Sequence, residues 1–148
     1  MFVGWCPICK DRVSDVKCNR CGFEITFEHR EDLEIQPEEA KQLIESKKAI
    51  IIDVRDNDEF ATTHVNNSLH IGLDELHKQL EEIQKNKTIL TVCHHGNRSM
   101  VAASFLSQKG LNVRSIAGGL EAYHEIDKGI KLYERYFDGH KFVITVID

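Results

Sequence analysis

Residues 88–110, TILTVCHHGNRSMVAASFLSQKG, decide the fold. The run TILTV has the composition of a strand buried in a parallel sheet. A helical pattern begins near Arg98 and ends at Gly110. Cys93 therefore stands between the end of a predicted strand and the start of a predicted helix. In open α/β sheets, ligands bind at this edge, beyond the carboxyl ends of the strands.

The segments around this stretch alternate in the same way. Further strands are predicted at AIIIDV (residues 49–54), SLHI (68–71) and VRSI (113–116). Helices are predicted at residues 37–48, 73–83 and 118–127 from their helical patterns of residues. The polar segment DNDEFATT, residues 56–63, is predicted to form a further short helix. Strands that alternate with helices at this rhythm predict an α/β domain with a mainly parallel sheet.

The loop CHHGNRS has the features of an anion site. A loop that curls from a strand end to a helix start points successive N–H groups inward, and the helix dipole adds positive potential. Gly96 allows the tight curl, and Arg98 offers a guanidinium fork for an oxyanion. Cys93 is therefore predicted to act as a nucleophilic thiolate. The alternative is a free cysteine that packs as a small apolar residue.

The two histidines of the loop have less defined roles. Either His94 or His95, when protonated, could help to hold a thiolate at Cys93. Consecutive loop residues usually point in different directions, so one of the two is expected to face solvent.

Four of the five cysteines lie within residues 6–21 as two C-x-x-C pairs, formed by Cys6, Cys9, Cys18 and Cys21. Two such pairs can complete a tetrahedral four-sulfur site, and the segment resembles a zinc-ribbon or rubredoxin-like knuckle. A module of about thirty residues cannot stabilise itself by burying carbon alone, so a metal would supply stability. We expect structural zinc, although iron can take the same thiolates. A redox-active dithiol is the alternative, but it would use a single C-x-x-C pair, so the second pair argues against it.

Composition excludes several classes of function. The chain has 148 residues, 41% hydrophobic and 29% charged residues and a net charge of −5, as in a globular protein without a basic stripe for nucleic acid. Its longest apolar runs, AIII and FVITVI, are too short to span a bilayer. The start, MFVGWCPICK, does not look like a secretory signal, so we expect a cytoplasmic protein.

Residues 33–127 resemble the rhodanese family. The resemblance is carried by IIDVRDNDEF (residues 51–60), His64, the loop CHHGNRS and SIAGGLEAY (115–123). It implies a parallel five-stranded sheet flanked by helices. It also implies transfer of sulfane sulfur from a donor such as thiosulfate to cyanide or a protein thiol. Cys93 would carry the sulfur as a persulfide. The residues that would bind the persulfide and the anionic donor are His94, His95, Gly96, Asn97, Arg98 and Ser99.

Loop length separates two related chemistries. Cell-cycle phosphatases that resemble this family place five residues between cysteine and arginine, whereas four lie between Cys93 and Arg98. The shorter ring favours a sulfur on the cysteine over a phosphoryl group. A phosphatase or arsenate reductase remains an alternative. Another alternative is a sulfur carrier or partner-binding module that is recruited through the knuckle.

The chain departs from the family pattern between residues 63 and 72. Glycines and prolines common in the family are replaced in THVNNSLHIG, and asparagine can take the left-handed backbone that such a turn needs. Asp53 and Arg55 are expected to support the site around the Cys93 loop without touching substrate themselves. The alternative is that they cap a helix and form a surface ion pair.

Residues 128–148 extend beyond the family's usual end. Asp138-Gly139, between two β-prone runs, predicts a hairpin. The run FVITVI is too apolar to remain exposed, so we expect it to pair with or pack against the strand GFEITFE that follows the knuckle. The predicted organisation is a knuckle at residues 1–30, a rhodanese-like domain at 33–127 and a C-terminal extension.

Overall fold

The computed structural model describes residues 4–26, 28–126, 132–137 and 142–147. Its main sheet has five parallel strands in the order β3-β7-β6-β4-β5. These strands are β3 (Glu34–Ile35), β4 (Ala49–Asp53), β5 (Leu69–His70), β6 (Thr88–Val92) and β7 (Val113–Ile116). The predicted α/β fold with a parallel sheet is confirmed. The residues themselves predicted four of the strands, and β3 was expected only from the family resemblance.

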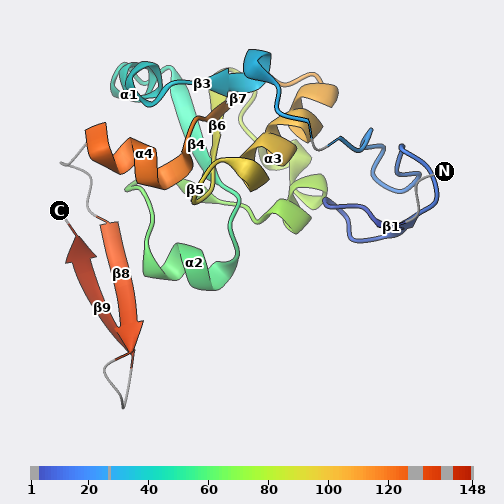
Figure 1. The fold of residues 1–148 in the computed structure, drawn as a ribbon. Coiled ribbons are helices and arrows are strands. Elements are labelled where there is room, and N and C mark those ends of the chain that lie inside the picture. Colours follow the sequence, from blue (N-terminus) through green and yellow to red (C-terminus); the bar gives the residue numbers. More distant parts are fainter. Residues whose placement is uncertain (1–3, 27, 127–131, 138–141, 148) are drawn as a thin grey trace.

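Helices cover both faces of this sheet (Figure 1). They are α1 (Pro37–Glu45), α3 (Asn97–Gln108) and α4 (Gly119–Ile126), whereas α2 (Asn57–Thr62) lies beyond the sheet, beside the C-terminal extension (Figure 1). Helices α1 and α4 pack on one face, where Ala40, Leu90 and Tyr123 belong to one apolar cluster. Helix α3 packs on the other face, where Ile89 and Phe105 belong to a second cluster. Both faces are therefore buried, as the continuous apolar strands require.

The register of β4 and β6 sets the position of the loop. Asp53 pairs with Val92, so the two strands end side by side. Cys93 and Val54 follow directly at the carboxyl edge of the sheet. The segments after β4 and β6 therefore meet at this edge.

Residues 73–83 form two 3-10 helices, η2 (Leu73–Lys78) and η3 (Leu80–Glu82), instead of the predicted α-helix. Backbone hydrogen bonds that span three residues recur in this segment, from Glu75 N–H to the Gly72 carbonyl at 2.8 Å and from Glu82 N–H to the Gln79 carbonyl at 3.1 Å, and the Gln79 N–H is shared between the Glu75 and Leu76 carbonyls. The predicted inner positions Leu76 and Ile83 are still buried. The prediction of a continuous α-helix was wrong because the same apolar spacing also suits short 3-10 turns.

The N-terminal module is built from short turns. Strands β1 (Gly4–Trp5) and β2 (Arg12–Val13) pair antiparallel, and Lys17 bridges Glu24. The predicted strand GFEITFE is wrong for its described residues, where only Glu24 has a β-bridge. A third 3-10 helix, η1 (Glu31–Leu33), leads from this module to β3.

The module packs directly on the C-terminal half of α3. Phe23 meets Phe105 edge to face, with ring centroids 5.8 Å apart, and both belong to one apolar cluster. Gln108 exchanges two hydrogen bonds with the Glu24 backbone, at 2.8 and 3.0 Å, and Lys109 Nζ donates to the Cys21 carbonyl at 2.7 Å. The module and the sheet domain therefore share a core.

The C-terminal extension contains β8 (Leu132–Phe137) and β9 (Phe142–Ile147), which pair antiparallel with Leu132 opposite Ile147. The predicted turn at Asp138-Gly139 lies outside the described residues. The expected pairing of FVITVI with the chain after the knuckle is wrong, because β9 pairs with β8 in a sheet of its own. Strand β8 lies beside α2, away from the N-terminal module (Figure 1). In the described part of the chain, no helix has the length and apolar character needed to cross a membrane.

Candidate functional site

Cys93 lies directly after β6 with its side chain only 1% exposed. Its Sγ accepts hydrogen bonds from the Gly96 N–H at 3.1 Å and the Ser99 N–H at 3.3 Å. Gly96 is the N-cap of α3 and has φ of 105°, a conformation that favours glycine. The loop and the first turn of α3 thus direct N–H groups at one sulfur, which stabilises negative charge there.

A pair of hydroxyl groups supports the sulfur from inside the fold. Ser99 Oγ lies 3.4 Å from Cys93 Sγ and 2.8 Å from Ser115 Oγ on β7, and all three residues are buried. Thr91 Oγ1 donates to the Ser99 carbonyl at 2.9 Å. This chain of contacts fixes the first turn of α3 against two strands, and it places a hydroxyl oxygen where it accepts from the Cys93 thiol.

The start of α4 holds the loop from its other side. The Leu120 N–H donates to the Cys93 carbonyl at 2.9 Å, and the Glu121 N–H reaches the His94 carbonyl at 3.4 Å. Gly119 has φ of 67°, and a Cβ placed there would lie 2.4 Å from both carbonyl oxygens. Only glycine allows α4 to approach the loop this closely.

Arg98 is engaged by Glu59 of α2. Its Nη1 and Nη2 donate to the two carboxylate oxygens at 2.6 and 2.9 Å. These hydrogen bonds lower the pKa of Glu59 to about 2 and raise the pKa of Arg98 above its ordinary value. The expected contact of Arg98 with an oxyanion stays a prediction. In the structure, Glu59 orients the Arg98 guanidinium group.

Both histidines of the loop are exposed. The His95 Nε2 lies 3.0 Å from Glu121 Oε2, and the His94 and His95 rings meet edge to face at 4.0 Å. One ligating atom from each of His94, His95 and Glu121 lies within 4.8 Å of the other two, so this trio could hold a cation at the surface. Neither histidine makes a hydrogen bond to Cys93 Sγ within the described residues.

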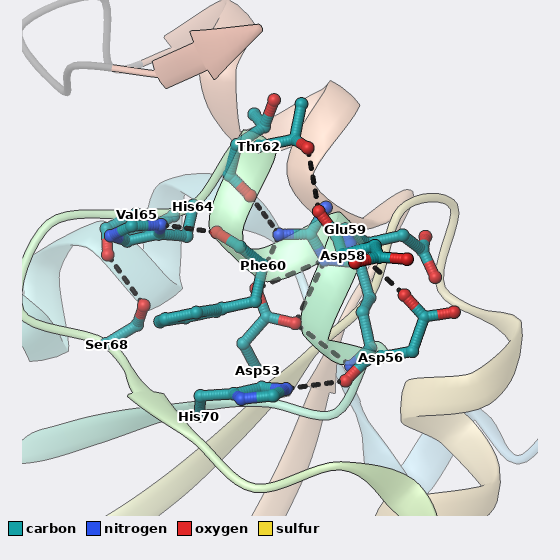
Figure 2. A network of polar contacts seen from close by, with 12 residues as sticks. Asp53, Asp56, Asp58, Glu59, Phe60, Thr62, His64, Val65, Ser68 and His70 are labelled. Carbon is teal, nitrogen blue, oxygen red and sulfur yellow. Dashed lines mark hydrogen bonds and ion pairs between the residues drawn. The ribbon is translucent and has the colours of Figure 1, made fainter. Parts of the chain in front are cut away.

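Asp53 and Arg55 form a buried pair, 0% and 3% exposed. Arg55 donates through Nε and Nη2 to the Asp53 carboxylate at 2.8 to 3.2 Å, and Nη2 also donates to the Thr63 carbonyl. His70 Nε2 donates to the Arg55 carbonyl at 2.7 Å. Figure 2 shows this network around Asp53 and α2. The pair fixes the segment between β4 and β5, so it is not a surface ion pair.

The cap of α2 is Asp56, whose side chain accepts from the Glu59 N–H at 3.1 Å. Phe60 lies between the rings of His64 and His70, with centroids 4.1 and 4.5 Å away (Figure 2). Asn67 has φ of 67°, as expected for an asparagine in a turn where the family often has glycine. Together these contacts set the position of α2 and therefore of Glu59.

The four N-terminal cysteines come together as predicted. The Sγ atoms of Cys6 and Cys21 lie 3.6 Å apart, those of Cys9 and Cys18 lie 3.4 Å apart, and all four lie within 4.8 Å of one another. A tetrahedral ion with sulfur at about 2.3 Å needs sulfur atoms about 3.8 Å apart. The donor set and its spacing therefore fit one metal ion.

Backbone groups favour thiolate at one member of this cluster, Cys18, whereas burial raises the pKa of Cys9 and of Cys21. Burial raises the pKa of Cys18, but the N–H groups of Cys21 and Arg20 outweigh it and lower that pKa to about 7. Gly22, which follows the second pair, has φ of 79° and closes the turn. A metal ion would be bound here by sulfur ligands that lie mostly buried.

Sequence reasoning missed three residues of this site: Glu59, Ser115 and Gly119. Glu59 and Ser115 lie far from Cys93 in the sequence, and only the fold brings them to the loop. Gly119 carried a signal, since two consecutive glycines before a helix indicate a close backbone approach. Of the predicted loop residues, Gly96 and Ser99 contact the Cys93 sulfur, and the binding roles of His94, His95, Asn97 and Arg98 stay predictions.

Comparison with known proteins agrees with this architecture. The family model described as rhodanese-like domain matches residues 36–126. The thiosulfate sulfurtransferase GlpE of Coxiella burnetii is 35% identical over 86 residues, which are 57% of this chain and 80% of that protein. The protein of the same name from Vibrio cholerae is 31% identical over 100 residues, which are 67% and 94% of the two chains.

Solved structures show the same fold. A rhodanese-like domain protein from Staphylococcus aureus aligns with a TM-score of 0.59 and 31% identity, covering 66% of this chain and 94% of that one. A rhodanese-related protein from Thermoplasma volcanium aligns with a TM-score of 0.58 and 29% identity, covering 74% and 96%. With a family match over more than half of its length, the chain belongs to the rhodanese-like domain family.

Proposed function

We propose that this protein is a rhodanese-type sulfurtransferase that carries sulfane sulfur on Cys93. The observation that carries the proposal is the pair of N–H donors, from Gly96 and Ser99, directed at Cys93 Sγ. Such donors stabilise both a thiolate and the anionic sulfur that it accepts. The relatives named thiosulfate sulfurtransferase support thiosulfate as the donor.

The reaction has two displacement steps. The Cys93 thiolate attacks the outer sulfur of thiosulfate; the sulfur–sulfur bond of the donor breaks, and sulfite leaves with its electron pair. A thiolate or cyanide then attacks the outer sulfur of the Cys93 persulfide and releases the Cys93 thiolate. Both steps exchange one bond to sulfur for another, so no external oxidant or reductant is consumed.

The narrow ring favours sulfur over phosphoryl transfer. Four residues separate Cys93 from Arg98, and the Arg98 fork is turned toward Glu59. Both Cys93 and its supporting Ser99 are buried. A single sulfur atom fits such a closed loop more readily than a tetrahedral phosphoryl group.

Mass spectrometry after thiosulfate treatment tests this function. We expect one added sulfur atom, located on Cys93 by peptide mapping, and thiosulfate:cyanide activity that is lost in Cys93→Ser. Cys93→Ser, which keeps the four N-terminal thiols, also serves as the control for sulfur placement, because it should take up no added sulfur. Unchanged activity in Cys93→Ser would overturn the proposal. A persulfide that forms without turnover would instead indicate a sulfur carrier.

For the N-terminal site we propose structural zinc, with iron as the other metal that four thiolates accept. Four sulfur ligands leave no open coordination position, so the ion would stabilise the module rather than act on substrate. Free thiols and a thiolate metal site suit a reducing compartment such as the cytoplasm. Elemental analysis of protein purified without chelator tests the site, and less than about half an equivalent of metal would contradict it.

A further inference from the structure

A cavity of about 390 Å³ separates the cysteine module from the Cys93 loop. Both parts of the chain form its walls. From the N-terminal module come Pro7, Thr26, Glu28 and His29. From the sheet domain come Leu73, the loop residues Gly96, Asn97 and Arg98, and α3 residues that include Val101. The cavity therefore exists only where the two modules meet.

Gly96 connects this cavity to the sulfur. Its N–H donates to Cys93 Sγ at 3.1 Å, while the same residue lines the cavity. A molecule in the cavity thus lies against the loop that holds the sulfur. A smaller cavity of about 190 Å³ also borders Arg98 and is lined partly by Lys10 of the module. Both cavities at Arg98 therefore have a wall from the cysteine module.

The wall supplied by the module is held firmly. Phe23 packs on Phe105, and Gln108 exchanges two hydrogen bonds with the Glu24 backbone. These contacts attach the module to the end of α3, the helix whose first turn surrounds Cys93 Sγ. The two walls are thus connected through one helix, and the shape of the cavity depends on both.

The lining indicates the chemistry of a ligand. The volume is in the range of small-molecule sites, and Leu73, Val101 and Pro7 give it apolar surface. Within the described residues, the Glu28 carboxylate has no ion-pair partner, so it can receive an ammonium group. Arg98 has five N–H donors, of which the contacts with Glu59 use two, so it can also receive a carboxylate.

We propose that this cavity binds the sulfur acceptor, and that the acceptor is a zwitterionic thiol of amino-acid or short-peptide size. The inference rests on the proposed sulfur transfer at Cys93. The acceptor thiolate attacks the outer persulfide sulfur, the sulfur–sulfur bond to Cys93 breaks, and its electron pair returns to Cys93 Sγ. The acceptor leaves as a persulfide. The cysteine module thereby forms part of the acceptor site.

Binding of S-methylglutathione, whose sulfur is blocked, tests the cavity without any reaction. We expect saturable binding to the metal-loaded protein by calorimetry. Val101→Trp, which fills the cavity, should weaken the affinity by about tenfold or more, and Glu28→Gln by about threefold to tenfold. Ser107→Trp places the same bulk on α3 outside the cavity lining and should leave the affinity within about twofold. Far-ultraviolet circular dichroism verifies that each variant is folded.

The outcomes separate this inference from the proposed function. Absence of saturable binding up to about 10 mM, or equal affinity for wild type and both cavity variants, would overturn the acceptor site. Persulfide formation on Cys93 in the same protein would then leave sulfur transfer intact. Binding that depends on Val101 and Glu28 in a protein whose Cys93 takes no sulfur would refute sulfur transfer instead.

Discussion

Arg98 and Glu59 are joined by two hydrogen bonds of 2.6 and 2.9 Å between a guanidinium group and a carboxylate. Arg98 belongs to the first turn of α3, and Glu59 belongs to α2. The contact therefore fastens the helix that follows the Cys93 loop to the helix that follows β4. It also fixes the direction of a cation beside the sulfur.

Replacement of Glu59 by glutamine should lower stability in a pH-dependent way. The pKa of Glu59 falls from 4.5 to about 2 in the folded protein, so its ionised form stabilises the fold above pH 4.5. This contribution is lost as the pH falls toward 2. Because both side chains are more than one third exposed, we expect only about 1 kcal/mol or less at neutral pH.

Urea unfolding of wild type and Glu59→Gln between pH 7 and pH 3 measures this effect. The stability difference should be constant above about pH 5 and should shrink below it. Asp58→Asn removes an exposed carboxylate from the same helix turn and is the matched control. A difference that persists unchanged to pH 3 would show that the ion pair is not its source.

Substitution of Gly119 by alanine should disrupt the loop. The new Cβ would lie 2.4 Å from the Cys93 and His94 carbonyl oxygens, and the residue has φ of 67°. We expect a loss of about 3 kcal/mol or more in the free energy of unfolding, together with slower persulfide formation. Gly110→Ala also meets a positive φ, of 85°, but nothing lies within 4 Å, so it should cost about 1 kcal/mol.

Chemical denaturation and single-turnover sulfur loading compare the two alanine variants. Gly119→Ala should be impaired in both measurements, and Gly110→Ala should load sulfur at the wild-type rate. Equal behaviour of the two would mean that the approach of α4 to the loop does not set the geometry around Cys93.

Local sequence patterns predicted the parts of this molecule that depend on short spacing. The apolar run TILTV indicates a strand buried on both faces, and this places Cys93 at the end of that strand. Each C-x-x-C pair is a short turn of the chain, so the spacing of the cysteines indicates that Cys6 and Cys9 meet the second pair. Asn67 adopts the left-handed backbone expected of it. Such features are decided within a few residues of the chain, where propensity and turn chemistry dominate.

Contacts between distant segments could not be predicted in this way. Glu59 reaches Arg98 across 39 residues, and Ser115 reaches Ser99 across 16, so each pair forms only after the sheet has assembled. The two-residue strand β3 is too short to show a pattern. Residues 73–83 were misassigned because apolar residues at spacings of three and four fit both α-helical and 3-10 turns.

The buried hydroxyl pair should affect stability and catalysis differently. Ser115→Ala leaves the Ser99 hydroxyl without this partner and should cost about 1–2 kcal/mol, with little change in sulfur loading. Ser99→Ala removes the hydroxyl that lies 3.4 Å from Cys93 Sγ and should slow loading by about tenfold. The double variant should regain stability, because no polar group is then left unpaired, but it should stay slow.

Unfolding free energies and loading rates of the three variants form a double-mutant cycle. A double variant whose destabilisation equals the sum of the single variants would indicate that the two hydroxyls do not interact. Recovery of the loading rate in the double variant would show that Ser99 acts on stability alone.

Loss of the metal should weaken α3 as well as the N-terminal module. Cys9→Ser removes one ligand, and the module shares an apolar cluster with Phe105 and Leu106 of α3. We expect metal content to fall and the free energy of unfolding to drop by about 3 kcal/mol or more. Amide exchange should become faster in the last turn of α3, where Gln108 contacts the module.

Cys93→Ser is the matched control, because it replaces another buried thiol that is not part of the four-cysteine cluster. It should keep its metal and its slow exchange near Gln108. If Cys9→Ser lost its metal but kept wild-type exchange throughout α3, the metal site would be energetically separate from the sheet domain. Faster exchange confined to the N-terminal module would lead to the same conclusion. Helix α3 couples the metal site to the sheet domain only if exchange becomes faster in the module and in α3.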